Sequence, residues 1–276
     1  MPSLRSVVVR LGFVVSVVSW TAGCGSSGGN ETGTGGSSGT AGTSGAAGTI
    51  GAAGTSGAGT GGSAGSGEGG AGGGAGGAPA VERWVVDNTT SIHGNAPMVL
   101  GSPQVIPSPQ GDALCFDGDD AVVLNANPVQ GLAAFTVEVF MRIDGITNAA
   151  FNQPRYLHVE TTDASRLTME ARVTDTSWYL DTFLLSSNGQ SRTLIDATKV
   201  HPVGQWTWTA LTYDGAQMRH FVDGVEDAGG AVTVPAYGAG KMSLGVRQNL
   251  VNWFVGCIRE VRITPSALAP AELQRP

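Results

Sequence analysis

Trp206-Thr-Trp-Thr-Ala-Leu-Thr-Tyr-Asp-Gly215 is the stretch of sequence that decides the fold class. Large aromatic residues and threonines crowd this run as they do in a β-strand, and Asp214-Gly215 closes it with a turn signal. A second run with the same character, Arg219–Val222, follows at once and ends at Asp223-Gly224. These residues predict short strands connected by tight turns.

The same pattern continues on both sides of this stretch. Asp-Gly and Asn-Gly pairs separate further runs rich in valine, threonine and aromatic residues, and no long helical periodicity interrupts them; only Pro265–Leu273 is expected to form a short helical turn. Many short strands without helices predict an all-β sandwich or jelly roll. The other predicted strands are Ala121–Leu124, Phe135–Ile143, Arg155–Thr161, Leu167–Val173, Trp178–Leu185, Lys241–Val246 and Ile258–Ile263.

Four segments stand out in order along the chain: Leu114–Leu124, Phe135–Arg142, the run from Trp206 to Val225, and Gly256–Ile263 with the tail Ala267–Glu272. In that order they resemble the opening strand, the core strand, the central hairpin and the closing strand with its tail in LamG-like jelly-roll domains. The resemblance implies a two-sheet antiparallel sandwich of the concanavalin A-like type over about residues 80–276. It implies much less about activity, because this fold carries lectins, adhesion modules, spacers and glycosidases.

Glycine divides the chain into regions. Residues 25–78 hold 25 of the 43 glycines and almost no large side chain, so this stretch cannot bury enough apolar surface to offset its ordering entropy. Glycine recurs every third residue from Gly33 to Gly57, the collagen period, but the stretch has no proline to favour a triple helix. We therefore expect a disordered linker over 24–78 and one domain over 79–276.

The N-terminus has the pattern of an export signal. Arg5 and Arg10 precede an apolar run over 11–20, which is too short to span a bilayer. Thr21-Ala-Gly-Cys24 resembles a bacterial lipoprotein processing site, although Thr21 stands where leucine is usual. The resemblance implies a signal peptide over 1–23, lipidation of Cys24 and anchoring at the cell envelope or surface. Ordinary cleavage and secretion, with Cys24 a free thiol, is the alternative.

The charge balance argues against a nucleic-acid partner. The chain has 15 basic and 22 acidic residues, a net charge of −7. Without Arg5 and Arg10 the counts are 13 and 22, a net charge of −9, and no basic run remains to follow phosphates. A carbohydrate or a cell-surface protein is the expected partner.

The resemblance also suggests a role for the other cysteines. In the resembled fold the opening and closing strands lie side by side, which places Cys115 near Cys257. An exported domain permits a disulfide bond between them. The alternative is two buried free thiols.

A polar sheet face is the first candidate site. If Arg155–Thr161 and Leu167–Val173 pair through a turn at Asp163–Arg166, alternation places several polar side chains on one face and apolar ones on the other. We expect Glu160 opposite Glu170 and His158 opposite Arg172. The next strand is expected to add Tyr179, Asp181 and Phe183 to this face. Such a face is a solvated surface, a sugar-binding face, or a catalytic site with two carboxylates.

Two further candidates lie in loops. Asp117, Asp119 and Asp120 offer oxygen ligands in one turn, and the resemblance allows calcium there, although Arg259 stands where an aspartate is common in the family. Hydrogen bonding within the turn is the alternative. The loop over 247–254 carries Trp253, a candidate sugar platform or a cap on the sandwich end. Its polar neighbours are Arg247, Asn249 and Asn252.

These observations favour a non-enzymatic surface lipoprotein whose domain binds carbohydrate or protein. A glycosidase or polysaccharide lyase on the same fold is the first alternative, and the absence of the Glu-x-Asp-x-x-Glu run found in glycosidases of this fold argues against it. A structural module of the cell envelope is the second. No cofactor other than calcium is expected.

Overall fold

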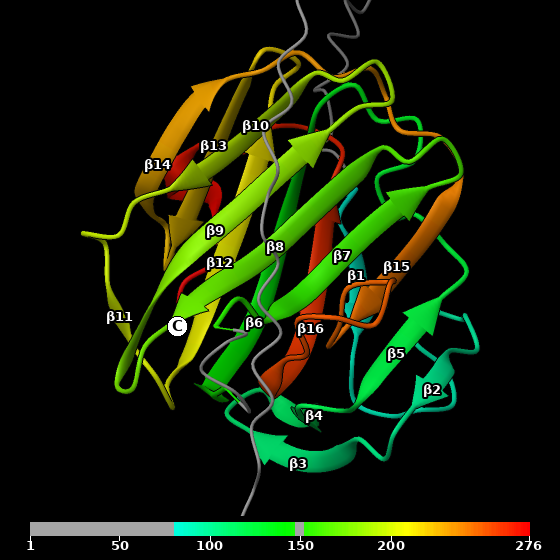
Figure 1. The fold of residues 1–276 in the computed structure, drawn as a ribbon, viewed down its shortest axis with the longest axis vertical. Coiled ribbons are helices and arrows are strands. Elements are labelled where there is room, and N and C mark those ends of the chain that lie inside the picture. The colour runs from blue at the N-terminus through cyan, green and yellow to red at the C-terminus, as the bar shows by residue number, and fades with distance from the viewer. Residues whose placement is uncertain (1–79, 147–151) are drawn as a thin grey trace, which may run out of the picture. The chain divides into compact units, whose positions relative to one another are not determined.

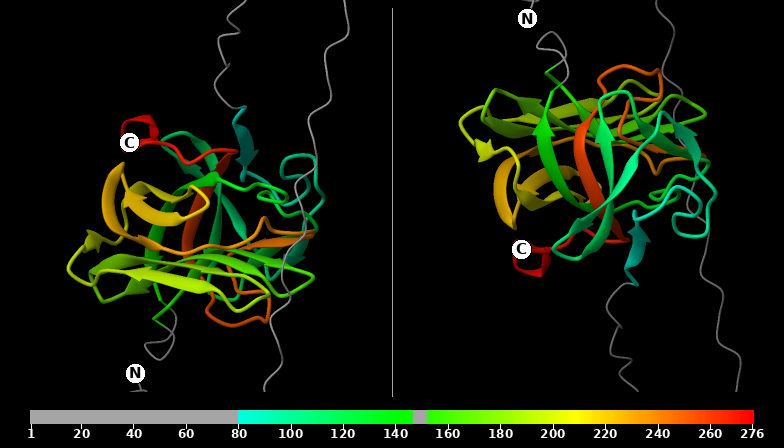
Figure 2. Two further views of the ribbon diagram at one scale, coloured as in Figure 1. Left: turned by 90° about the horizontal axis from the view of Figure 1, so that it is seen from above. Right: turned by 90° about the horizontal axis from the view of Figure 1, so that it is seen from below.

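The computed structural model describes residues 80–146 and 152–276, which form a sandwich of two antiparallel sheets (Figure 1). We call the sheet nearer the viewer in Figure 1 the front sheet and the other the back sheet. Every pairing between named strands is antiparallel, and Figure 2 shows the two layers edge-on. The predicted fold class is thus confirmed.

The front sheet has eight strands, of which β11 pairs only with β9. In spatial order they are β10 (Ser191–Ile195), β9 (Ser177–Leu185), β8 (Arg166–Val173), β7 (Arg155–Thr161), β15 (Gly240–Leu244), β5 (Ala121–Leu124) and β2 (Met98–Leu100), with β11 (His201–Pro202) beside β9.

The back sheet also has eight strands, of which β1 pairs only with β16. In spatial order they are β14 (Val225–Ala231), β13 (Gln217–Val222), β12 (Trp206–Tyr213), β6 (Phe135–Gly145), β16 (Val255–Thr264), β4 (Gly111–Asp117) and β3 (Gln104–Ser108), with β1 (Glu82–Val85) beside β16. A 3₁₀ turn over Pro270–Glu272 lies within the segment predicted to be helical.

The core lies between the two sheets and is formed by the alternate residues of each strand. Leu167 and Met169 of β8 belong to the same buried cluster as Val137 and Val139 of β6. Because every second residue of a strand points the same way, the intervening residues of the front sheet point away from the core. That outer face is where polar side chains gather.

The disulfide bond between Cys115 and Cys257 is confirmed. Cys115 on β4 and Cys257 on β16 are direct cross-strand partners, and their sulfur atoms are bonded. The predicted opening run over 114–124 is two strands, however. β4 joins the back sheet and β5 joins the front sheet, and the turn at Gly118 carries the chain from one to the other.

The predicted register of the hairpin formed by β7 and β8 is wrong. Glu160 pairs with Arg166 and His158 pairs with Thr168, so neither faces Glu170 or Arg172. The turn is tighter than expected, because Thr161 closes it with a backbone hydrogen bond to Ser165. The offset is an even number of residues, so His158, Glu160, Glu170 and Arg172 stay on the predicted face.

The predicted signal peptide over 1–23, the predicted lipidation site Cys24 and the predicted linker over 24–78 lie outside the described residues. Within 80–146 and 152–276, no helix is long and apolar enough to cross a membrane.

Candidate functional site

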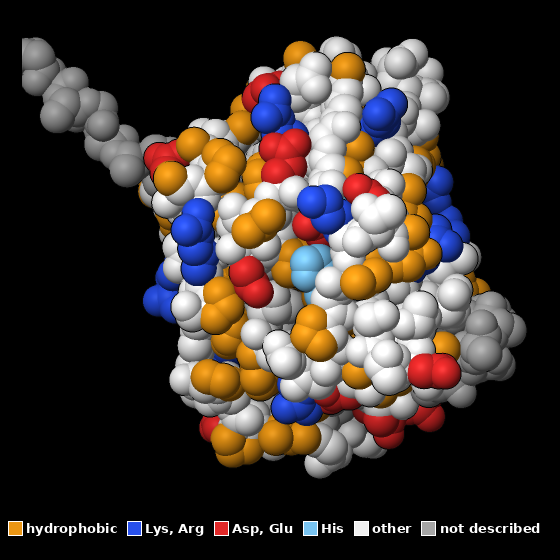
Figure 3. All heavy atoms as spheres, turned by 90° about the vertical axis from the view of Figure 1, so that its left-hand side faces the viewer, with side chains coloured by type: hydrophobic (Ala, Val, Ile, Leu, Met, Phe, Trp, Pro, Cys, Tyr) orange, Lys and Arg blue, Asp and Glu red, His pale blue; other side chains and the backbone are white. Residues whose placement is uncertain are grey.

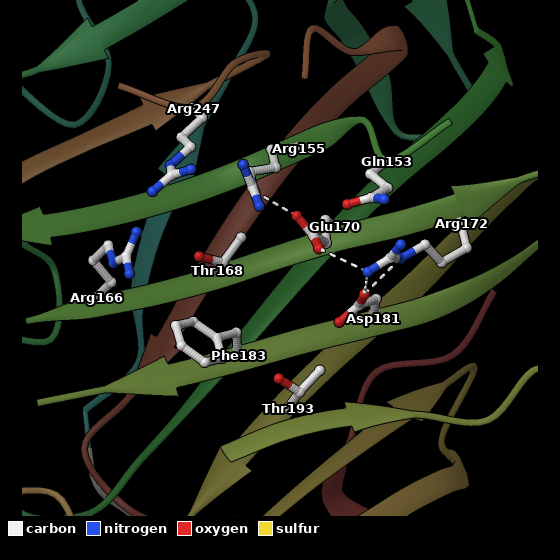
Figure 4. Close-up of a pocket in the computed structure, with 10 residues that line it drawn as sticks. All are labelled: Gln153, Arg155, Arg166, Thr168, Glu170, Arg172, Asp181, Phe183, Thr193 and Arg247. Atoms are coloured by element: carbon white, nitrogen blue, oxygen red, sulfur yellow. Dashed lines mark hydrogen bonds and ion pairs between the residues drawn. The ribbon is translucent and has the colours of Figure 1, made fainter. Parts of the chain in front are cut away.

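A polar pocket of about 280 Å³ opens on the outer face of the front sheet. Strands β7 to β10 supply most of its walls, and the loops before β7 and after β15 complete it (Figure 4). Its lining consists of Gln153, Arg155, Arg166, Thr168, Glu170, Arg172, Asp181, Phe183, Thr193 and Arg247. We refer to it as the front-sheet pocket.

Two ion pairs form the floor of the pocket. Arg172 donates from Nε to Asp181 Oδ2 at 2.7 Å, and its Nη2 lies 3.8 Å from Glu170 Oε1. Arg155 Nε contacts the other oxygen of Glu170. Glu170 and Asp181 are direct cross-strand partners and both are buried. The floor is therefore a row of alternating charges that holds its side chains in place.

Burial and a neighbouring carboxylate raise the pKa of Glu170. Burial is the main effect and raises the pKa of Glu170 to about 7; the charge of Asp181 acts in the same direction, and Arg155 and Arg172 oppose it. Glu170 therefore gains or loses its proton near neutral pH. Asp181 forms its ion pair with Arg172.

A bulge in β7 places Arg155 in the pocket. The register shifts between Arg155 and Leu157, so Arg155 pairs with Glu170 while Leu157 pairs with Met169. Between them, Tyr156 points into the core and donates a hydrogen bond to Thr209. The bulge turns a residue at the start of the strand toward the ion pairs.

The structure brings some of the predicted site residues together and separates the others. It brings Glu170, Arg172, Asp181 and Arg247 together in the front-sheet pocket. Glu160 and Asn249 instead line a second, shallower depression. The two aromatic residues Tyr179 and Trp253 are half-buried and line neither of these two hollows.

His158 is on the predicted face but cannot reach a ligand. Its side chain is fully buried, and Gln248 of the loop after β15 donates to its backbone oxygen. Neither ring nitrogen has a hydrogen-bond partner among the described residues. Burial and the charges of Arg155, Arg247 and Arg166 lower the pKa of His158 to about 3, so the ring is neutral at pH 7.

This burial predicts a loss of stability in acid. The folded pKa of about 3 lies below the unfolded value near 6.5, so the contribution of His158 is complete above pH 6.5 and is lost as the pH falls. Between pH 6.5 and the folded pKa, each pH unit lowers the free energy of unfolding by about 1.4 kcal/mol. When the pH falls from 7.5 to 5.0, the free energy of unfolding of the natural chain should decrease by about 2 kcal/mol more than that of His158→Gln. Chemical denaturation at the two pH values measures both decreases. Equal losses in the two proteins would contradict the assignment.

Sequence reasoning missed several members of the pocket. Arg155 was expected only at the start of a strand, and Arg166 only in a turn. The alternation of β8 carried the signal for Thr168, which stands two residues from Glu170, whereas Phe183 of β9 was expected on this face. No sequence signal pointed to Gln153 or Thr193.

The three aspartates of the predicted calcium site lie together at the turn between β4 and β5. Their ligand oxygens are within 4.8 Å of one another. Asp120 is buried, and its carboxylate accepts backbone N–H groups of Ser102 and Asp117, as the turn alternative requires. A hydrogen bond with Asp117 and the charge of that residue raise the pKa of Asp119. Calcium binding at this turn stays a prediction.

Arg259, expected beside these aspartates, makes its contacts elsewhere. Its Nε donates to the backbone oxygen of Gln110 at 2.9 Å, and its Nη1 lies 3.8 Å from Asp87.

Comparison with known proteins identifies similar chains. A family model described as the concanavalin A-like lectin/glucanases superfamily matches residues 116–274. No curated protein sequence matches the chain. Among solved structures, the binding domain of Paraclostridial Mosquitocidal Protein 1 is 11% identical with a TM-score of 0.51, and the match covers 69% of this chain and 49% of that one.

Two more structures show the range of similar chains. The receptor binding domain of botulinum neurotoxin mosaic serotype C/D is 13% identical with a TM-score of 0.50, covering 69% of this chain and 48% of that one. A third similar structure is domain 4 of AbnA, a GH43 extracellular arabinanase from Geobacillus stearothermophilus, in complex with arabinotriose. It is 17% identical with a TM-score of 0.49, and the match covers 69% of this chain and 94% of that one. The chain thus spans about half the length of the two toxin domains. At these identities the likeness concerns the fold alone.

Proposed function

Because this chain belongs to the concanavalin A-like lectin/glucanases superfamily, we propose that it is a binding module that holds a carbohydrate in the front-sheet pocket without cleaving it. The observation that carries the proposal is the pocket itself, a hollow of about 280 Å³ in which charged, amide and hydroxyl side chains surround one aromatic ring. Binding sites for small ligands are largely pre-formed and need only a few well-placed polar groups.

The lining suits the chemistry of a sugar. Thr168 and Thr193 offer hydroxyl groups, and Gln153 offers an amide that both donates and accepts hydrogen bonds. Phe183 is half-buried, so part of its ring is open to contact with the apolar C–H groups of a sugar.

The leader fits a role at the cell surface. If Cys24 is lipidated, the glycine-rich linker would separate the domain from the membrane and let the front-sheet pocket meet a glycan or a cell-surface protein. The disulfide bond between Cys115 and Cys257 agrees with an exported protein, because such bonds persist in oxidising compartments. Display on a lipid anchor is part of the proposal.

Glycoside hydrolysis is the second candidate, and one observation favours it. Glu170, whose pKa burial raises to about 7, stands directly across from Asp181, and a glycosidase uses a pair of carboxyl groups. Against it, both carboxylates are buried beneath the guanidinium groups of Arg155 and Arg172. A general acid or nucleophile must reach the substrate, so binding is the better account.

Phe183→Ala tests the binding site. We expect the affinity of the full chain for a glycan that it binds on an array to fall about 2- to 10-fold, as the loss of one aromatic contact predicts. Tyr179→Ala is the matched control, since Tyr179 is a half-buried aromatic residue on the same strand and face but outside the pocket. Surface plasmon resonance measures both variants.

Two results would count against the proposal. If Phe183→Ala binds the glycan with unchanged affinity, the binding site lies elsewhere on the domain. The release of new reducing ends from a bound polysaccharide, abolished by Glu170→Gln, would make the protein an enzyme.

A further inference from the structure

Basic side chains are concentrated in the front-sheet pocket of an acidic protein. The chain has 15 lysine and arginine residues against 22 acidic ones, yet four arginines and only two carboxylates line this one pocket. On the side of the domain shown in Figure 3, basic and acidic side chains are instead interspersed. The pocket is therefore a local positive site on a negatively charged molecule.

Two of the four arginines are neutralised and two are not. Arg155 pairs with Glu170, and Arg172 pairs with Asp181. Arg166 and Arg247 have no carboxylate oxygen within 4.0 Å among the described residues, and their guanidinium groups make no hydrogen bond to those residues. The charge that remains in the pocket thus belongs to these two side chains.

The two unpaired guanidinium groups lie at the same end of the pocket. Figure 4 shows Arg166 and Arg247 on the same side, with Arg155 next to Arg247. Arg166 lies over the ring of Phe183, 5.7 Å from its centre. Arg247 begins a loop closed by backbone hydrogen bonds from its own N–H to Val251 and from Leu250 to its oxygen.

Gathering like charges is unfavourable unless an anion is bound between them. Burial is the main cause that lowers the pKa of Arg155, and the charge of Arg247 acts in the same direction, while Glu170 opposes it. Arg155 also has a buried donor, Nη1, without an acceptor among the described residues. The planar fork of a guanidinium group matches a carboxylate or a sulfate, and such charge-assisted bonds are about twice as strong as neutral ones.

We propose that the glycan bound in the front-sheet pocket is anionic, with a carboxylate or sulfate group held by Arg166 and Arg247 and its sugar ring against Phe183. This inference rests on the proposed function and narrows its ligand to acidic oligosaccharides. Arg166 and Arg247 then determine specificity, while Thr168, Thr193 and Gln153 bind the hydroxyl groups.

An array of neutral, uronate-bearing and sulfated oligosaccharides, probed with the full chain, tests this inference. We expect the bound oligosaccharides to carry uronate or sulfate, and the two sets of spots distinguish these anions. Arg166→Gln and Arg247→Gln should each weaken this binding about 10- to 100-fold, since each removes a charge-assisted contact. Both variants should fold normally, because neither side chain has an ion-pair partner in the described domain to lose.

The control is Arg275→Gln, which removes the same charge from an exposed residue whose guanidinium group, within the described part of the chain, donates a hydrogen bond only to the backbone oxygen of Pro270. Its binding should match that of the natural chain. Binding to neutral glycans that is unaffected by Arg166→Gln and Arg247→Gln would overturn the inference and leave the proposed function standing. Equal affinity for poly-glutamate, a polyanion without sugar, would also overturn it. A chain that binds no glycan of any class would refute the proposed function and the inference together.

Discussion

Replacing Cys115 and Cys257 together by alanine is expected to lower the free energy of unfolding by about 5 kcal/mol. The bond joins residues 142 positions apart, and the chain-entropy model assigns about this value to a closed loop of that length. Both residues lie at one cross-strand position between β4 and β16, so two small side chains leave the sheet pairing possible. Denaturation in urea, followed by tryptophan fluorescence, measures the loss.

The same change should lower the melting temperature by about 10–20 °C, given the usual entropy of unfolding of a domain with about 200 residues. A reducing agent should destabilise the natural chain to the same extent and have no effect on the double variant. A double variant as stable as the natural chain would show that the bond contributes nothing to the stability of the folded domain.

Glu170→Ala is expected to destabilise the domain by about 3–5 kcal/mol, the usual cost of removing one partner from a buried ion pair. Only 6% of the Glu170 side chain is exposed, and its loss leaves Arg155, itself 15% exposed, without its carboxylate partner. Thermal and urea unfolding of the two proteins at pH 7.5 measure the difference.

The exposed pair formed by Arg219 and Glu226 gives a matched control. Their side chains are 49% and 40% exposed, and the charged atoms lie 3.7 Å apart. Because exposed pairs contribute less than about 1 kcal/mol, Glu226→Ala should change stability little. If Glu170→Ala lowers the free energy of unfolding no more than Glu226→Ala does, the ion pairs at the floor of the pocket do not stabilise the domain. For the same reason, Glu170→Ala is a poor probe of ligand binding.

The sequence was enough to predict the sandwich and the composition of the polar face. Turn signals at Asp214-Gly215 and Asp223-Gly224 bounded strands that the structure confirms, and the alternation of β8 and β9 placed Glu170, Arg172 and Asp181 on one face. These features are local, since a strand's period and a turn's residues are read within a few positions.

The assembly of the pocket depended on features that are not local. The turn at Thr161–Ser165 set a register that the turn residues alone left open, and it moved Glu160 away from Glu170. A bulge in β7 brought Arg155 to Glu170, and a loop from beyond β15 brought Arg247 to the strands. Bulges and loop placement are decided by packing across the sheet, which a single strand's sequence does not specify.

Hydrogen–deuterium exchange of the full chain, with and without an acidic oligosaccharide that it binds on the array, tests the central claim most directly. The account predicts that bound ligand slows exchange in β8, in β9 and in the loop over 247–254, because these segments carry Arg166, Phe183 and Arg247. Strands β12 to β14 of the back sheet should be unaffected. Protection confined to the back sheet, or to the turn that carries Asp117, Asp119 and Asp120, would contradict the claim that the front-sheet pocket is the binding site.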